Sequence, residues 1–153
     1  MTPSKVNVLD TAASEEVLRR ARRIAVLGIK PESLRDRAAF YIPAYLADVG
    51  YEIVPVPTAY PGVTSILGRP VQRTLRDVGP VQILSVFMRP EEVPAYVTAM
   101  LELRPEVWFQ SGLMHEASAG ALIAAGIAVA HECIGCRRAA ISPGALPLEG
   151  QRP

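Results

Sequence analysis

Two features of the sequence predict an α/β protein with a doubly wound sheet of five parallel strands. Short apolar segments alternate along the chain with helix-like segments of about 10–15 residues, a length typical of the crossover between parallel strands. The segment at residues 81–87, for example, is almost wholly apolar, as expected of an internal strand covered on both faces. These features indicate a three-layer arrangement of helix, sheet and helix.

The first expected element is a short helix that leads into the first strand. Ser14 is a favourable N-cap, and Glu15 and Glu16 follow in the first turn, where the helix dipole favours carboxylates. Arginines gather towards the end of the same segment, where the dipole favours cations. Residues 1–23 are therefore expected to form a helical lead-in to the main domain.

The remaining elements follow in strict alternation. Strands are expected at residues 24–28, 51–56, 81–87, 106–110 and 127–132. Helices are expected at residues 36–49, 89–105 and 115–126, with Pro43 inside the first of them. Residues 60–80 are rich in glycine and proline, so only a short helical turn is expected there, at 74–78.

Length and composition are those of a single globular domain. The chain has 153 residues, of which 50% are hydrophobic and 20% charged. A chain of this size buries a continuous core without help from a metal or a disulfide. We place the domain at residues 24–141 and expect the segment 142–153 to form a loop-like tail.

Charge and hydrophobicity argue against several classes of partner. The net charge is +1, so the surface as a whole does not favour nucleic acid or an acidic membrane, and an anion site would have to be local. The first residues lack the apolar core of a secretory signal, and the apolar runs are too short to span a bilayer. We therefore expect a cytoplasmic protein that binds neither nucleic acid nor membrane.

The predicted fold limits the search for a ligand site to a few loops. In a doubly wound sheet, ligands bind outside the carboxyl ends of the strands, near the point where the strand order reverses. The loops to consider therefore begin after Leu27, Val56, Phe87 and Gln110.

The first of these loops starts with a glycine and is basic. Gly28 allows a tight turn and a close approach of the backbone to a phosphate, and the helix that follows adds the positive end of its dipole. Lys30, Arg35 and Arg37 add full positive charges. Each cation alone is equally well explained as a solvated surface residue, but their grouping at a strand end predicts an anion site.

The second loop argues against a nicotinamide cofactor. Of the three glycines of a dinucleotide fingerprint only Gly28 is present, and no acidic residue lies between Glu52 and Asp77 to hold the ribose hydroxyls. An NAD-dependent dehydrogenase is therefore not expected. Val56 and Pro57 instead predict an apolar wall for the face of an adenine or a sugar ring.

The third and fourth loops carry few charges. Phe87 and Arg89 surround a helix start in the third loop, whereas Gln110 and Ser111 at the end of the fourth strand are suited to the amide groups of a ligand. Trp108 is expected in the core. The sequence of these loops contains no nucleophile elbow, no P-loop and no close pair of carboxylates, so binding is favoured over catalysis.

The two cysteines, Cys133 and Cys136, leave three interpretations open. With His131 and Glu132 they could supply four ligands to a zinc ion. As a C-x-x-C pair they could act as a redox dithiol, although such a pair usually opens a helix after an early strand. The favoured interpretation is a pair of reduced thiols in a late turn, because disulfides are rare in the cytoplasm.

Five stretches of the sequence resemble the small stand-alone CoA-binding proteins, a family related to the N-terminal domain of the succinyl-CoA synthetase alpha subunit. They are IAVLGIKP, FYIPAYLADVGYEIVPV, VQILSVF, RPEVWFQSGLMHE and AGIAVAHEC, and they follow the order of the family over residues 24–133. The resemblance implies a Rossmann-like domain with coenzyme A, or an acyl-CoA, across the strand ends. The sequence differs from the family pattern at Ala39, Thr58 and Met88.

The resemblance also implies roles for individual residues. The residues that it places next to phosphate groups are Gly28, Ile29, Lys30 and Arg37. Val56 and Pro57 would line the adenosine. The residues that would face the nucleotide and the pantetheine are Val86, Phe87, Gln110, Ser111 and Gly112.

These observations together predict a non-catalytic CoA-binding module that acts as a sensor or as a partner subunit. A self-sufficient acyl-CoA ligase would need a second domain with a phosphorylated histidine, for which 153 residues leave no room. Two alternatives stay open. One is a thiol- or metal-dependent protein that uses Cys133 and Cys136, and the other is a ligand-free protein that binds a protein partner or a second copy of itself.

Overall fold

The apolar segments of the chain form one parallel sheet in the computed structural model, which describes residues 6–141. Its strands are β1 (Arg23–Leu27), β2 (Glu52–Val56), β5 (Ile83–Val86), β6 (Glu106–Phe109) and β7 (Val129–His131). They lie in the order β2-β1-β5-β6-β7, and every neighbouring pair is parallel. The predicted α/β fold with a doubly wound, five-stranded parallel sheet is therefore confirmed.

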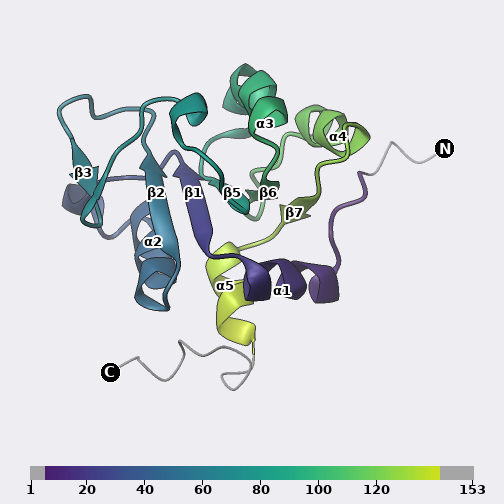
Figure 1. Ribbon diagram of the computed structural model, residues 1–153, viewed down its shortest axis with the longest axis horizontal. Coiled ribbons are helices and arrows are strands. Elements are labelled where there is room, and N and C mark those ends of the chain that lie inside the picture. Colours follow the sequence, from purple (N-terminus) through teal and green to yellow (C-terminus); the bar gives the residue numbers. More distant parts are fainter. Residues whose placement is uncertain (1–5, 142–153) are drawn as a thin grey trace.

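The sheet separates two hydrophobic cores, because successive residues of a strand point to opposite faces. In β1, Ile24 and Val26 pack into one core, and Ala25 and Leu27 into the other. Helices α1 (Thr11–Arg20), α2 (Ala38–Asp48) and α5 (Ile134–Ala140) cover the first face. Helices α3 (Val97–Leu103) and α4 (Glu116–Ala124) cover the second (Figure 1), so the fold has the three expected layers.

The first helix begins earlier than expected. Asp10, rather than Ser14, is the N-cap of α1, and its Oδ1 accepts a hydrogen bond from the backbone N of Ala13 at 2.9 Å. Ser14 is buried inside the helix. Both residue types cap helices well, and the burial of Val17 and Leu18 against the sheet is compatible with the earlier start.

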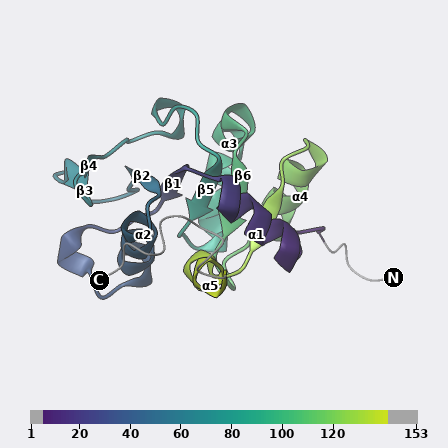
Figure 2. The ribbon, with the colours of Figure 1, turned by 60° about the horizontal axis from the view of Figure 1, so that its bottom comes forward.

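The segment between β2 and β5 contains more structure than the sequence indicated. Two short antiparallel strands, β3 (Ser65–Ile66) and β4 (Arg69–Pro70), form a hairpin that Figure 2 shows on the α2 side of the molecule, away from α4. Their two-residue length gives no alternating pattern to detect. The predicted helical turn near 74–78 is present as a 3-10 turn, η2 (Leu75–Asp77).

The helix predicted over residues 89–105 is divided. Residues Pro90–Tyr96 form a 3-10 helix, η3, and only Val97–Leu103 are α-helical. Pro94 explains the division, because its ring removes a backbone donor and clashes with the preceding turn of an α-helix. Arg104, in the left-handed region with φ of 57°, ends α3 before Pro105.

The turn expected around the two cysteines is the start of α5. Cys133 is its N-cap, and Cys136 lies in its first turn. The helix has seven residues and includes Gly135, a combination with little periodic signal in the sequence. The expected tail at 142–153 and the first five residues of the lead-in lie outside the described part of the chain, and the domain limits remain a prediction.

Candidate functional site

The carboxyl ends of the five strands lie level along one edge of the sheet. The register pairs Leu27 of β1 with Val56 of β2 and Val86 of β5, and continues through Phe109 of β6 to His131 of β7. The chain leaves β1 towards β2 on one side and returns to β5 on the other. The strand order therefore reverses at β1, and a ligand is expected at this point of the edge.

At the reversal point, Gly28 and Phe87 are in contact through their backbones. Gly28 has φ of +88°, and a Cβ atom there would lie 2.0 Å from the carbonyl oxygen of Phe87. The N–H of Gly28 donates to the oxygen of Val56, and that of Phe87 to the oxygen of Leu27. Only glycine fits this position, because any side chain would meet rigid backbone.

A cavity of about 490 Å³ opens between the loop after β1, the start of α2 and the loop after β5. We call it the α2 cavity. Its lining residues are Gly28, Lys30, Arg37, Ala38, Ala39, Thr58, Phe87, Met88, Arg89, Glu92 and Leu113.

The α2 cavity is electropositive at the end formed by the helix. Ala38 and Ala39, the first two residues of α2, line it, so the positive end of the helix dipole adjoins the space. Arg37 is the N-cap and is exposed, and within residues 6–141 its guanidinium has no hydrogen bond or ion pair. The positive end of α2 therefore lacks an intramolecular anionic partner in the described part of the chain.

Lys30 connects the loop after β1 to the loop after β2. Its side chain is half-buried, its Nζ lies 3.3 Å from the hydroxyl of Tyr60, and it stacks 5.7 Å from the centre of that ring. The backbone N of Lys30 donates to the oxygen of Ala39 at 3.1 Å. This amide is therefore used within the fold, and the charge of the side chain is what Lys30 offers to a ligand.

Arg89 also lines the α2 cavity, but it is paired with acidic neighbours. Its Nη2 lies 2.9 Å from the carboxylate of Glu92, and its Nε lies 3.6 Å from that of Glu91. The hydrogen bond to Glu92, followed by the charge of the same carboxylate, raises the pKa of Arg89. Glu92 lines the cavity as well, so the two charges partly cancel there.

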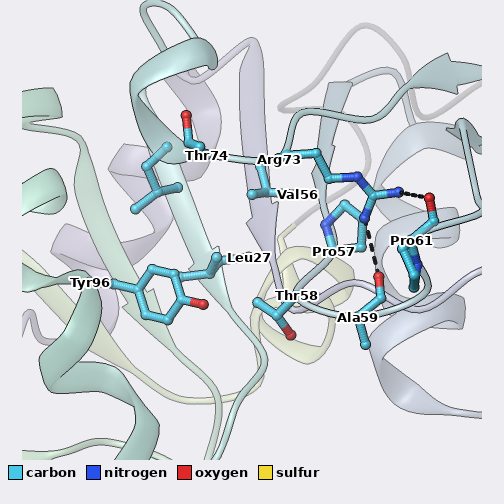
Figure 3. Close-up of a pocket in the computed structure, with 10 residues that line it drawn as sticks. Leu27, Val56, Pro57, Thr58, Ala59, Pro61, Arg73, Thr74 and Tyr96 are labelled. Carbon is cyan, nitrogen blue, oxygen red and sulfur yellow. Dashed lines mark hydrogen bonds between the residues drawn. The ribbon is translucent and has the colours of Figure 1, made fainter.

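A second cavity, of about 380 Å³, lies beyond the ends of β1 and β2 (Figure 3). We call it the β2 cavity, and it shares Thr58 with the α2 cavity. Its lining residues are Leu27, Val56, Pro57, Thr58, Ala59, Pro61, Arg73, Thr74, Leu75 and Tyr96. Most of these side chains are apolar, and Tyr96 and Arg73 lie on opposite sides of the space in Figure 3.

Arg73 holds the wall of the β2 cavity together. Its guanidinium donates to the carbonyl oxygens of Ala59, Tyr60, Pro61 and Val63, two of which are drawn in Figure 3. The planar guanidinium group, with its several N–H donors, thus fixes a loop that has no regular secondary structure. The sequence carried no signal for this role, because Arg73 lies in the segment that showed no pattern.

The structure brings seven of the predicted site residues to these cavities. They are Gly28, Lys30, Arg37, Phe87 and Arg89 in the α2 cavity and Val56 and Pro57 in the β2 cavity. The side chains of Ile29 and Val86 are instead fully buried in the core. Arg35 and Ser111 are exposed outside both linings, with the Nε of Arg35 donating to the oxygen of Glu32. Their roles towards a ligand remain predictions.

The loop after β6 uses its polar groups inside the protein. Gln110 is buried, and its Oε1 accepts a hydrogen bond from the backbone N of Ile134, at the start of α5, at 3.1 Å. The N–H of Gly112 donates to Nε2 of His131 at 3.1 Å. Trp108 is in the core as predicted, with its Nε1 bonded to the oxygen of Glu132. Gln110 therefore connects the end of β6 to α5, and Gly112 connects the loop after β6 to β7.

Neither a metal cluster nor a membrane span is found in the described part of the chain. Residues 6–141 contain no group of three or more histidine, cysteine or acidic side chains that could hold a metal ion. The groups suggested as extra zinc ligands are engaged elsewhere, His131 with Gly112 and Glu132 with Arg137. None of the helices in this range is long and apolar enough to cross a bilayer.

The chain is similar to known proteins both in sequence and in fold. The sequence model of a family described as the CoA binding domain matches residues 22–139. Among curated proteins, the uncharacterized protein YneT of Bacillus subtilis (strain 168) is 34% identical over 116 residues, which cover 74% of this chain and 78% of YneT.

Two solved structures of similar fold are those of proteins from Thermus thermophilus and Pyrococcus horikoshii OT3. The structure of cell-free ID.343 from Thermus thermophilus has a TM-score of 0.78 and 33% identity, covering 86% of this chain and 98% of that one. A hypothetical protein from Pyrococcus horikoshii OT3 has a TM-score of 0.76 over 91% of this chain and 97% of its own. With 24% identity, the second likeness concerns the fold alone.

Proposed function

Because the chain belongs to the CoA binding domain family, we propose that it binds coenzyme A or an acyl-CoA across the α2 and β2 cavities. The observation that carries this proposal is the α2 cavity, lined by the start of a helix together with Lys30 and Arg37. Coenzyme A requires an electropositive space, since it carries a pyrophosphate and a ribose 3′-phosphate.

The phosphates would bind at the start of α2. A helix N-terminus offers backbone N–H groups and the positive end of the dipole, and Ala38 and Ala39 add no side chain that would keep a phosphate away. Lys30 and Arg37 add two full charges. The close contact of Gly28 with Phe87 keeps the floor of the cavity free of a side chain at that point.

The adenosine would occupy the β2 cavity. Its wall of Val56, Pro57 and Leu27 is apolar and lies at the ends of the two strands next to the switch point. The ring of Tyr96 and the threonines at the rim offer one aromatic surface and two hydroxyl groups. Thr58, which lines both cavities, would lie between the base and the phosphates.

We propose that the chain acts as a sensor or as a partner module and that it performs no reaction on the bound molecule. Among the described residues that line the two cavities, Glu92 is the one carboxylate, and Arg89 is bonded to it. A general acid or base needs a titratable group within reach of the reacting atoms. The linings contain cations and apolar side chains, which suit binding.

Calorimetric titration tests this proposal directly. Coenzyme A, 3′-dephospho-CoA and NAD would each be titrated into the full chain at low and at moderate salt. We expect micromolar binding of coenzyme A, weaker binding without the 3′-phosphate, and a loss of affinity as salt screens the charges. NAD should bind more weakly than coenzyme A, because it has fewer phosphate charges.

Two arginines provide a matched pair for the same titration. Arg37→Ala removes a charge that lines the α2 cavity, and we expect it to lower the affinity for coenzyme A about tenfold. Arg35→Ala removes an equally exposed arginine from outside the cavity lining and should change the affinity less than about twofold. Equal losses for both variants, or no heat and no thermal shift with millimolar coenzyme A, would contradict the proposed site.

A further inference from the structure

We propose that Cys133 and Cys136 form a redox-active dithiol that exchanges with small uncharged disulfides and is oxidised to an intrachain disulfide. The proposal concerns a part of the sheet edge that neither cavity reaches, and it does not depend on the binding of coenzyme A. It assigns a modification site to the two thiols, both of which are reduced in the structure.

The backbone holds the two cysteines close together at the start of α5. Cys133 is the N-cap of α5, and its Sγ accepts a hydrogen bond from the backbone N of Cys136 at 3.2 Å. Residues three apart on a helix have Cβ atoms about 5–6 Å from each other, within reach of the spacing across a disulfide after a small movement. The first thiol therefore lies over the turn that carries the second.

The hydrogen bonds give the two sulfurs different roles. The pKa of the Cys136 thiol is raised, first by its side-chain hydrogen bond to Cys133 and then by burial. Cys136 thus keeps its proton, and the sulfur of Cys133 accepts a hydrogen bond from the Cys136 backbone. We therefore assign the first attack to Cys133, whose sulfur has this backbone donor beside it, and the second attack to Cys136.

An apolar groove leads to both sulfurs. It lies between α2 and α5, has a volume of about 350 Å³, and is lined by Tyr41, Ile42, Tyr45, Cys133, Gly135, Cys136 and Ala139. Tyr41 is 53% exposed at its rim. Gly135 lets the helices approach, since a Cβ there would lie 3.1 Å from Ile42. The lining contains no charged residue, so the groove favours a disulfide with uncharged arms.

The reaction is a balanced thiol–disulfide exchange. The Cys133 thiolate attacks one sulfur of a disulfide RS–SR, the RS–SR bond breaks, and a Cys133–SR bond forms as RS⁻ leaves and takes up a proton. Cys136 then loses its proton and attacks the sulfur of Cys133, releasing the second RS⁻. The two protein thiols are oxidised to one disulfide, and RS–SR is reduced to two molecules of RSH.

The test uses the full chain and the pair mercaptoethanol and hydroxyethyl disulfide. Reduced protein would be equilibrated without oxygen at a series of thiol-to-disulfide ratios. The samples would then be quenched with acid and alkylated, and the mass of the protein would be measured by mass spectrometry. We expect a monomer that lacks two hydrogen atoms and takes up no alkyl group. This disulfide should be favoured at least about tenfold over the same disulfide in the urea-unfolded chain, because the fold raises the effective concentration of the thiols.

Variants separate the steps of the exchange. Cys136→Ser should accumulate one molecule of mercaptoethanol as a mixed disulfide on Cys133, because the second attack is missing. Ala139→Glu places a carboxylate in the groove and should slow the exchange about threefold or more, whereas Ala140→Glu, just outside the lining, should leave the rate unchanged. Mixed disulfides that persist on Cys136 of the unmodified chain, crosslinked dimers, or no reaction before unfolding would overturn the proposal.

Discussion

The loops after β1 and β6 follow strands of the same sheet and end at the same edge, yet they use their polar groups differently. In the loop after β1, the charges of Lys30 and Arg37 border a cavity. In the loop after β6, the side chain of Gln110 and the N–H of Gly112 are bonded to α5 and to β7. The charges of the first loop border the α2 cavity, whereas the polar groups of the second loop join neighbouring elements of the fold.

The difference shows that a position at the carboxyl edge is necessary for a ligand site but does not make one. Both loops have a glycine with positive φ, Gly28 at +88° and Gly112 at +78°. What distinguishes them is the structure that follows. The loop after β1 leads into the eleven-residue helix α2, whose start adjoins the cavity. Next to the loop after β6 lies the start of α5, where Gln110 already supplies an acceptor.

The largest expected effect compares the two glycines. Gly28→Ala would place a Cβ 2.0 Å from the carbonyl oxygen of Phe87 and should lower the free energy of unfolding by more than about 3 kcal/mol. Gly112→Ala meets nothing within 4 Å, so it carries only the cost of the left-handed backbone, about 1 kcal/mol. Urea denaturation of both variants measures the difference, and equal losses would show that the contact at the switch point is not rigid.

A smaller effect is expected when one polar group of each loop is removed. Gln110→Leu leaves the backbone N of Ile134 without its acceptor and should lower the free energy of unfolding by about 1–3 kcal/mol.

Lys30→Met keeps most of the side-chain volume and removes the charge, so we expect about a tenfold loss of affinity for coenzyme A. Each variant would be measured by both denaturation and calorimetry.

The comparison predicts that Gln110→Leu lowers the stability without lowering the affinity for coenzyme A, and that Lys30→Met lowers the affinity without lowering the stability. The affinity of the Gln110→Leu protein should stay within about twofold of the original, provided that the protein is folded at the temperature of the titration. A clear loss of affinity in this variant would favour the sequence-based expectation that the amide of Gln110 meets the ligand. A clear loss of stability in Lys30→Met would mean that the contact with Tyr60 matters more for the fold than for binding.

Much of the fold was predictable because parallel strands leave a strong pattern. The segments around Ile24, Ile83 and Val107 are buried on both faces of the sheet. Nearly every residue in them is therefore apolar, and the segments stand out in the sequence. The β3–β4 hairpin, with two residues in each strand, and the seven-residue helix α5 were missed. In such short elements a few tertiary contacts decide the structure, and the sequence has no period long enough to record them.

A residue of the candidate site was predictable where it lies next to a strand or helix that the sequence itself predicts. Gly28 and Arg37 could be found because they directly follow a strand and precede a helix. Arg73 and Tyr96 could not, since they reach the β2 cavity from segments that are distant in sequence, Arg73 from a loop and Tyr96 from the end of η3. The sequence also did not indicate the bond between Gln110 and the start of α5, because α5 itself was not predicted, and the role of Gln110 towards a ligand stays a prediction.

The smallest expected effect concerns the one carboxylate among the described residues that line the α2 cavity. Glu92 lies 2.9 Å from Arg89 and partly cancels its charge. Glu92→Gln should therefore raise the affinity for coenzyme A about twofold to fourfold at low salt, with the gain disappearing as salt is added. Glu91→Gln is the matched control, because Glu91 lies 3.6 Å from the same arginine but outside the cavity lining, and it should give less than half that gain. Equal gains would mean that the net charge of this turn acts at long range, whereas no gain would mean that the phosphates bind out of reach of Arg89.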